Sequence, residues 1–313
     1  MRILITGGRG MLGTDLCEIL GWEHDCTPVG TAEMDVTSLA AVTERVHAER
    51  PELILHSAAY TDVDGCERDP DRAFRVNALG TWHVASAAAS IGAAVIVIST
   101  DFVFDGQQQA PYTEFDATRP ISEYGASKRA GEQLAAGACP RCTIVRTQWL
   151  YGIHGRCFPD TLLRAAAAGR PLRVVSDQIG APTFTRDVAG KIAHLLRGPG
   201  ARGEAGAGVP PLLPIYHINN SGACSWYDFA VAILRGAGFD HVPIEPIPAA
   251  EWPSPAPRPA YSVLRRRALE LVGADDLRPW QDALAEFLQE RQARGAGRDG
   301  FVRAGGTLLA SRV

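Results

Sequence analysis

The segment Arg2-Ile3-Leu4-Ile5-Thr6-Gly7-Gly8-Arg9-Gly10-Met11-Leu12-Gly13 decides the fold of this 313-residue chain. An apolar run leads directly into a turn in which glycine recurs at every third position, at 7, 10 and 13. Glycine permits a tight turn and lets backbone N–H groups approach a pyrophosphate at a helix N-terminus. A strand before this turn and an amphipathic helix after it, over residues 11–20, are the context of a dinucleotide fingerprint. The segment therefore predicts a Rossmann-type nucleotide site.

Short apolar runs and longer helical patterns alternate through the first 150 residues. The apolar runs lie at 2–6, 53–57, 95–99 and 143–147, and the helical patterns at 11–20, 38–49, 71–91 and 127–136. Nearly continuous apolar runs are typical of strands buried on both faces of a parallel sheet. We expect one more strand before Gly30, although Pro28 interrupts it. The pattern predicts an α/β fold with a Rossmann-type doubly wound parallel sheet.

The rest of the chain is less regular. After residue 150 proline becomes frequent, which is typical of loops, and helical patterns remain at 158–168, 226–236 and 280–292. We therefore expect residues 1–150 to form an NAD(P)-binding domain, to which a later segment at about 178–220 returns. Residues 151–295 are expected to form mainly a smaller C-terminal substrate-binding domain, and residues 296–313 a flexible tail.

The coenzyme preference depends on the end of the second strand. An NAD-specific site usually places an acidic residue about 20 positions after the glycine turn, where it binds the adenosine ribose. The expected strand end, Val29-Gly30-Thr31, has no carboxylate, and Asp25 precedes the apolar part of the strand. Arg9 in the turn could pair with a 2′-phosphate, and Asp35 could contact the adenine. These positions favour NADPH, with NADH use left open.

Tyr124-Gly125-Ala126-Ser127-Lys128 carries the predicted chemistry. Four residues are about one helical turn, so the phenol and the ammonium face the same way. Of the 31 Lys and Arg residues only Lys128 and Lys191 are lysines, so a lysine here is informative. A nearby ammonium lowers the pKa of a phenol, which can then protonate a carbonyl oxygen as hydride reaches its carbon. We expect a catalytic pair; the alternative is an exposed helix pair without a catalytic role.

A third catalytic group is expected from the end of a neighbouring strand. The run at 95–99 leads into Thr100 and Asp101, and ligands of open α/β sheets bind at the carboxyl ends of the strands. We expect Thr100 to bind the substrate carbonyl, with Ser99 as the second choice, and Asp101 to hold a sugar hydroxyl. The alternative is that these hydroxyls only cap the strand.

Composition limits the partners of the chain. A net charge of −4 gives no electrostatic reason to expect nucleic acid or an anionic membrane as a partner. No apolar run reaches the roughly 18 residues needed to cross a bilayer. The N-terminus leads into the first strand without the features of a secretory signal. We therefore expect a cytoplasmic protein.

Several segments, in order, resemble the extended short-chain dehydrogenase/reductases and, among them, the dTDP-4-dehydrorhamnose reductase family. The segments are 57–64 (SAAYTDVD), 99–104 (STDFVF), 124–128 (YGASK), 146–151 (RTQWLY), 177–183 (DQIGAPT) and 257–259 (PRP). The likeness covers about residues 1–290. In this order the set is specific to the family.

The resemblance implies roles for individual residues. The cofactor would contact Gly7, Gly10, Met11, Leu12, Asp35, Val36, Ala58, Ala59 and Tyr60, together with Asn77, Tyr124 and Lys128. The catalytic residues would be Thr100, Tyr124 and Lys128. The sugar nucleotide would lie near Val63, Asp64, Thr100, Asp101, Tyr124, Trp149 and Arg258. Trp149 offers an apolar face to a deoxysugar, or could equally be a core residue, and Arg258 offers a fork for pyrophosphate or pyrimidine oxygens.

Some members of the resembled family carry a magnesium site built from glutamates at a dimer interface. Asp15 occupies one matching position, but Arg186 stands where a second carboxylate would be expected. A positive charge at a cation site leads us to predict no metal, and a monomer or weak homodimer.

By this resemblance the leading hypothesis is the NADPH-dependent reduction of the C4 keto group of dTDP-4-dehydro-L-rhamnose to dTDP-L-rhamnose. An alternative is a 4-ketoreductase or dihydrostreptose-type synthase acting on a related dTDP-deoxysugar in antibiotic biosynthesis, with the same catalytic residues. Asp101 leaves a dehydratase open. A non-catalytic NADP-binding regulatory subunit is a further alternative, but such relatives lose the tyrosine or the lysine, and Tyr124 and Lys128 are both present.

Overall fold

The computed structural model describes residues 1–198 and 208–299. Its centre is a parallel sheet of six strands in the order β10-β5-β4-β3-β1-β2. The strands are β1 (Arg2–Thr6), β2 (Asp25–Val29), β3 (Leu53–His56), β4 (Ala94–Thr100), β5 (Cys142–Thr147) and β10 (Ile215–His217). The strand order reverses between β1 and β3, and ligands of doubly wound sheets bind outside such a switch point. The predicted Rossmann-type fold is confirmed.

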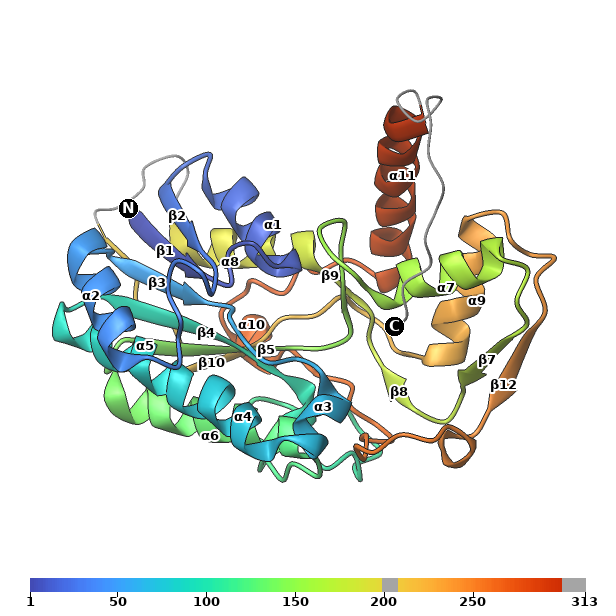
Figure 1. Cartoon of the computed structure of the whole chain (residues 1–313), viewed down its shortest axis with the longest axis horizontal. Coiled ribbons are helices and arrows are strands. Elements are labelled where there is room, and N and C mark those ends of the chain that lie inside the picture. The colour runs from blue at the N-terminus through green and yellow to red at the C-terminus, as the bar shows by residue number, and fades with distance from the viewer. Residues whose placement is uncertain (199–207, 300–313) are drawn as a thin grey trace.

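Helices cover both faces of this sheet (Figure 1). The helices α1 (Met11–Leu20), α8 (Thr185–Arg197) and the short α10 (Arg267–Leu271) pack on one face, and α2 (Leu39–Glu49), α5 (Gly80–Ser90) and α6 (Glu123–Ala138) on the other. Successive strand residues point to opposite faces, so each strand supplies both cores. Ile3 and Ile5 of β1 pack towards α1 and α8, whereas Leu4 packs towards α2 and α5.

The strand interrupted by proline forms at the edge of the sheet, as β2. Pro28 lies opposite Ile5 in the parallel pair. An edge strand has one unpaired side, so the missing N–H of proline costs little there. The other predicted strands and the helix over residues 11–20 are confirmed to within one or two residues.

The long helical pattern at 71–91 is divided in the structure. It consists of α4 (Pro70–Phe74), the π-helical turn η1 (Arg75–Leu79) and α5, and it follows α3 (Val63–Arg68), which the sequence did not predict. Single π-turns inside helices are frequent at functional sites. Here the turn holds Asn77, one of the predicted site residues.

The second core lies beyond the carboxyl edge of the sheet (Figure 1). It is built by α7 (Phe158–Ala167), α9 (Trp226–Gly236) and α11 (Trp280–Asp299), with an aromatic cluster of Tyr151, Phe184, Phe229 and Phe287. Three two-stranded sheets surround this core: β7 (Leu172–Val175) with β12 (Ile244–Ile247), β6 (Leu150–Tyr151) with β9 (Thr183–Phe184), and β8 (Ile179–Gly180) with β11 (Cys224–Ser225).

The boundaries between the two cores follow the chain only in part. Helix α8 and strand β10 belong to the sheet layer, in the segment at about 178–220 that was expected to return to it. Helix α11 extends past the predicted end at residue 292, and residues 300–313 of the predicted tail lie outside the described residues. Within the described ranges, no helix is long and apolar enough to cross a membrane.

Candidate active site

The glycine turn lies where the ends of β1 and β3 meet. Gly7 has a φ of 62°, and a Cβ there would lie 2.8 Å from the backbone nitrogen of Ala58. A Cβ at Gly13 would lie 2.1 Å from the Gly7 carbonyl oxygen. No side chain caps the N-terminus of α1 at Gly10, so the first helical N–H groups are free to bind a phosphate. The turn thus has the geometry of a pyrophosphate cradle, with Met11 and Leu12 at its helical end.

The sequence predicts no carboxylate at the end of β2, but the structure places the carboxylate of Glu33 there. Glu33 folds back so that one carboxylate oxygen accepts a 2.9 Å hydrogen bond from the Gly30 N–H and the other pairs with Arg9. The sequence reasoning missed it because Glu33 lies three residues beyond the strand end, and only the turn brings it back. Asp35 accepts 2.9 and 2.8 Å hydrogen bonds from the backbone and hydroxyl of Thr37. Arg9 of the glycine turn is therefore paired with an acid.

Asn77 connects the segment after β3 to helix α6. Its side chain accepts a 2.8 Å hydrogen bond from the Tyr60 N–H and donates a 3.0 Å bond to the Tyr60 carbonyl. It also donates a 3.1 Å bond to the hydroxyl of Ser127, one residue before the catalytic lysine position. This fixes the segment of Ala58, Ala59 and Tyr60 relative to α6. Val36 is buried beneath Gly80, and its carbonyl is bound by His83.

Lys128 is buried and lies in the first half of α6, which Ser122 caps by accepting a 3.2 Å hydrogen bond from the Gly125 N–H. The Lys128 ammonium donates a 2.7 Å hydrogen bond to the carbonyl oxygen of Ile98 on β4. Burial lowers the pKa of Lys128 to about 8, against the opposing effect of Glu132 one turn further along the helix. The ammonium is thus close to its protonation equilibrium near neutral pH.

The pKa of Tyr124 is raised in the structure, so the prediction that Lys128 lowers it is wrong for this arrangement. Burial of the phenol is the main cause, and the charge of Asp101 adds to it, while the Thr100 hydroxyl opposes it. The lysine instead points its donor at Ile98. A phenol with a high pKa is a proton donor in the resting site.

Thr100 and Asp101 lie at the carboxyl end of β4, as predicted. The Thr100 hydroxyl donates a 2.9 Å hydrogen bond to Asp101 and accepts a 3.2 Å bond from the Phe102 N–H. Burial raises the pKa of Asp101 to about 6, although the Ser262 and Thr100 hydroxyls oppose the rise. Tyr124, Thr100 and Asp101 therefore form one coupled group of hydroxyls and a carboxyl.

A cavity of about 540 Å³ adjoins this group. Phe102 lines the cavity and stands edge-on to Tyr124, with ring centroids 5.5 Å apart. Trp149 lines it too, stacked on Trp226 at 3.6 Å between centroids and 10° between planes. The other lining residues come mostly from the second core: Phe158, Arg173, Val174, Val175, Gln178, Ala249, Trp252, Ser254, Ala256, Pro257, Arg258, Pro259 and Ser262.

Asp64 and Arg258 meet across the two cores, although they lie almost 200 positions apart in the sequence. Their side chains form a 3.0 Å ion pair, and Asp64 also accepts a 2.9 Å hydrogen bond from Ser254. Burial opposes ionisation of Asp64, but the Ser254 hydroxyl and the Arg258 guanidinium lower its pKa overall. Val63 precedes Asp64 at the start of α3. Of the predicted substrate residues, Trp149 and Arg258 line the cavity, and Asp64 adjoins it through its pair with Arg258. The cavity wall does not include Val63, Thr100, Asp101 or Tyr124.

Sequence reasoning missed the part of the cavity wall that comes from distant loops and from α9. Trp226, Arg173 and Trp252 carry no local pattern that would indicate a ligand. Gln178 lies in the resembling segment at 177–183, which by itself predicts no ligand contact for it. The one signal available was that tryptophan is rare in this chain, with six residues, three of which line the cavity.

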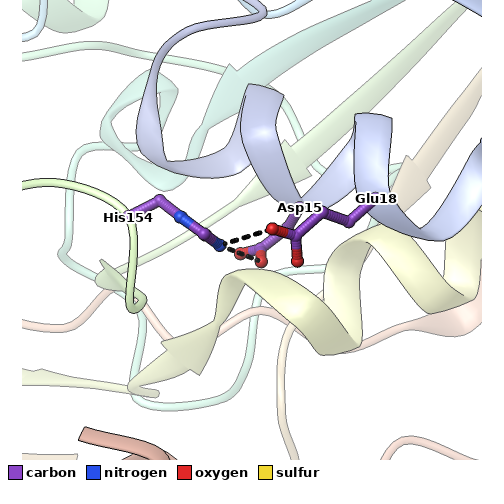
Figure 2. A group of neighbouring side chains, drawn as sticks. All are labelled: Asp15, Glu18 and His154. Carbon is purple, nitrogen blue, oxygen red and sulfur yellow. Dashed lines mark ion pairs between the residues drawn. The ribbon is translucent and has the colours of Figure 1, made fainter. Parts of the chain in front are cut away.

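The magnesium site of the resembled family can be tested on the residues around Asp15. Asp15, Glu18 and His154 point towards one another, and their ligand atoms lie within 4.8 Å of each other (Figure 2). However, the Arg186 guanidinium lies 3.8 Å from Asp15 and 3.4 Å from Glu18. A divalent cation placed there would face a fixed positive charge, so these residues do not fit a magnesium ion.

A glycine turn after the first strand of a doubly wound sheet, a Tyr-x-x-x-Lys pair on α6 and a cavity shared with a second core together define an extended short-chain dehydrogenase/reductase. The model of the RmlD substrate binding domain family matches residues 1–293. The chain belongs to this family, as the sequence segments predicted.

Two relatives and one solved structure illustrate the similarity. A dTDP-4-dehydrorhamnose reductase of Streptomyces griseus is 39% identical over 91% of this chain and 92% of its own length. A probable dTDP-4,6-dihydroxy-2-methyloxan-3-one 4-ketoreductase of Streptomyces antibioticus is also 39% identical, over 91% and 94%. The crystal structure of dTDP-4-dehydrorhamnose reductase from Bacillus anthracis in complex with NADP is 38% identical, covers 92% of this chain and 99% of its own, and has a TM-score of 0.86.

Proposed function

We propose that the chain reduces the C4 keto group of dTDP-4-dehydro-L-rhamnose to give dTDP-L-rhamnose, with NADPH as the reductant. The observation that carries this proposal is the group of Tyr124, Thr100 and Asp101 at the end of β4, where Phe102 packs against Tyr124 and lines the same cavity as Trp149 and Arg258. The reductases of Streptomyces griseus and Bacillus anthracis, the latter with NADP, support the substrate and the cofactor.

The residues divide the chemistry between them. When bound, NADPH supplies the hydride that reaches C4 of the sugar. Tyr124 donates its proton to the carbonyl oxygen, for which its raised pKa keeps it protonated. Thr100, now bound to Asp101, can turn its hydroxyl to the same oxygen. Lys128, a buried amine one helical turn from Tyr124 on α6, would supply the positive charge that stabilises the phenolate left after the transfer.

The cavity residues hold the rest of the substrate. The stacked rings of Trp149 and Trp226, which both line the cavity, offer an apolar surface to the deoxysugar, and Arg258 offers N–H donors to a pyrophosphate or pyrimidine oxygen. The ion pair with Asp64 already orients the Arg258 guanidinium, so an anionic ligand could bind the same guanidinium beside Asp64. This favours a nucleotide-linked sugar over a free one.

Glu33 at Arg9 weakens the case for a strong NADPH preference, since the acid could also serve an adenosine ribose. NADH therefore remains a second coenzyme within the proposal. We further propose a cytoplasmic monomer or weak homodimer that needs no metal.

A second candidate function is a 4-ketoreductase acting on a related dTDP-deoxysugar. The ketoreductase of Streptomyces antibioticus, equally similar to this chain, supports it. The catalytic residues would be the same. A non-catalytic NADP-binding subunit is disfavoured, because such relatives lose the tyrosine or the lysine and this chain has both Tyr124 and Lys128.

The two sugars can be distinguished directly. Purified protein is given NADPH and, in parallel, dTDP-4-dehydro-L-rhamnose or a dTDP-4-keto sugar with a different C2 or C3 substituent. The proposal expects a higher kcat/KM for the rhamnose precursor and dTDP-L-rhamnose as its product. A higher kcat/KM for the other sugar would favour the second candidate.

A further inference from the structure

One cluster of charged groups lies outside the active site, at the junction of the two cores. It comprises Asp15 and Glu18 of α1, His154 of the loop after β6, Arg186 of α8 and Glu290 of α11, and is named here the Arg186 junction. Arg186 pairs with all three carboxylates. Its guanidinium lies 3.8 Å from Asp15 and 3.4 Å from Glu18, and it is in close contact with Glu290. The guanidinium is therefore the centre of the cluster.

Asp15 is the member whose charge most needs compensation. The residue is fully buried, and within the described part of the chain neither carboxylate oxygen has a hydrogen-bond partner. Burial raises its pKa, although the nearby Thr185 hydroxyl, His154 and Arg186 oppose the rise. The cationic or potentially cationic groups beside it are His154, at 3.7 Å, and Arg186, at 3.8 Å. A buried carboxylate of this kind is stable only beside a positive charge.

The junction lies directly behind the glycine turn. Asp15 is one helical turn after Met11, the first residue of α1. The loop that carries His154 packs against the same residue: a Cβ at Gly152 would lie 3.0 Å from the Met11 side chain, and one at Gly155 3.4 Å. The junction thus holds the helical end of the turn between α8 and this loop.

We propose that Arg186 is the resident cation of this junction, in the place where a divalent metal would otherwise lie, and that it positions the glycine turn for the coenzyme. The positioning role rests on the proposed function, because it assumes that NADPH binds at this turn. The charge role does not depend on it. No residue of the junction touches the reacting atoms.

The test compares wild type with Arg186→Gln and Arg186→Glu. The matched control is Arg197→Glu, since Arg197 also lies on α8 and pairs with Glu23 beyond the end of α1, but away from the turn. For each variant, the dissociation constant for NADPH is measured by fluorescence titration and Tm by thermal unfolding. Both are measured in EDTA, in MgCl2 and in ZnCl2.

Wild type should show the same Tm and the same NADPH affinity in all three conditions. In EDTA, both Arg186 variants should bind NADPH about tenfold more weakly, with the coenzyme-saturated kcat changed little. A divalent cation should restore affinity and Tm, most fully in Arg186→Glu, because the carboxylates that remain can then bind it. In Arg197→Glu, neither the NADPH affinity nor the Tm should change between the three conditions.

Two results would overturn the proposal. A saturable rise of wild-type Tm with either metal, or a fall in EDTA, would make a metal the resident cation. Arg186 variants that keep wild-type NADPH affinity would remove the positioning role.

If Arg186→Glu does not fold without metal, refolding in MgCl2 supports the charge role and failure to refold contradicts it. Wild type that binds no NADPH would contradict the proposed function, while the Tm series would still test the cation.

Discussion

The ammonium of Lys128 donates a 2.7 Å hydrogen bond to the carbonyl oxygen of Ile98, and this bond connects helix α6 to the end of β4. The strand end two residues later carries Thr100, so the lysine and the threonine are set on one rigid unit. The buried lysine has its pKa lowered to about 8. Its charge is therefore sensitive to its surroundings.

The first prediction concerns the alkaline limb of the pH profile. If protonated Lys128 is required, kcat/KM should fall as the pH rises through about 8. Glu132 raises the pKa of Lys128, so Glu132→Gln should move this limb to lower pH. Because Glu132 also pairs with buried Arg146, folding of the variant is checked by circular dichroism. A limb that stays in place or moves to higher pH would contradict the role of Glu132.

The second prediction concerns stability and Asp101. Its pKa is raised from 3.8 to about 6, so its contribution to stability is fully present below pH 3.8 and is lost as the pH rises through 6. At about pH 8 the ionised group costs the fold up to about 3 kcal/mol. Asp101→Asn should therefore raise the free energy of unfolding at pH 8 and have little effect near pH 4. Equal effects at both pH values in urea titrations would argue against a buried ionised Asp101.

The third prediction concerns coenzyme choice. Glu33 pairs with Arg9, and the hydrogen bond from Arg9 lowers the pKa of the Glu33 carboxyl. The same pair occupies the Arg9 guanidinium. Glu33→Gln should free Arg9 for a 2′-phosphate and raise the ratio of kcat/KM for NADPH over NADH by about fivefold, while Arg9→Gln should lower it. Steady-state kinetics with both coenzymes measure the ratio. A ratio unchanged in both variants would show that the pair does not face the coenzyme.

The fourth prediction concerns the stacked tryptophans. Trp149 has a φ of 47°, a conformation that costs a non-glycine residue about 1–3 kcal/mol. Its ring is held between Trp226 and Gly180, where a Cβ would lie 2.4 Å from the indole. Trp226→Ala should raise KM for the dTDP-sugar more than it lowers kcat and should abolish the coupled indole signal in near-ultraviolet circular dichroism. Trp226→Phe should retain most of the substrate affinity. An unaltered KM in Trp226→Ala would separate Trp149 from substrate binding.

Much of the fold could be predicted because it depends on short-range patterns. The apolar runs of β1, β3, β4 and β5 alternate with helices, and the glycine turn marks where the first pair joins. The candidate catalytic residues could be named for the same reason, since the Tyr124–Lys128 spacing is local and Thr100 follows a strand directly; their catalytic roles stay a prediction.

What could not be predicted depends on contacts between distant segments. Glu33 reaches Arg9 only because the chain turns after β2, and Trp226 reaches Trp149 only because α9 packs on the loop after β5. The pKa of Tyr124 was predicted with the wrong sign, because spacing along a helix shows the nearby lysine but not the burial of the phenol. Burial is a property of the assembled fold.

The central claim is that Tyr124 protonates the C4 carbonyl oxygen of the dTDP-keto sugar during reduction by NADPH. The most direct test measures NADPH oxidation and the sugar product with dTDP-4-dehydro-L-rhamnose, for wild type and Tyr124→Phe, with NADPH binding measured separately. The account predicts dTDP-L-rhamnose from the wild type and turnover at least about 100-fold slower in Tyr124→Phe, with NADPH affinity retained. It would be contradicted by wild type that oxidises no NADPH with active substrate, or by a Tyr124→Phe variant with wild-type turnover.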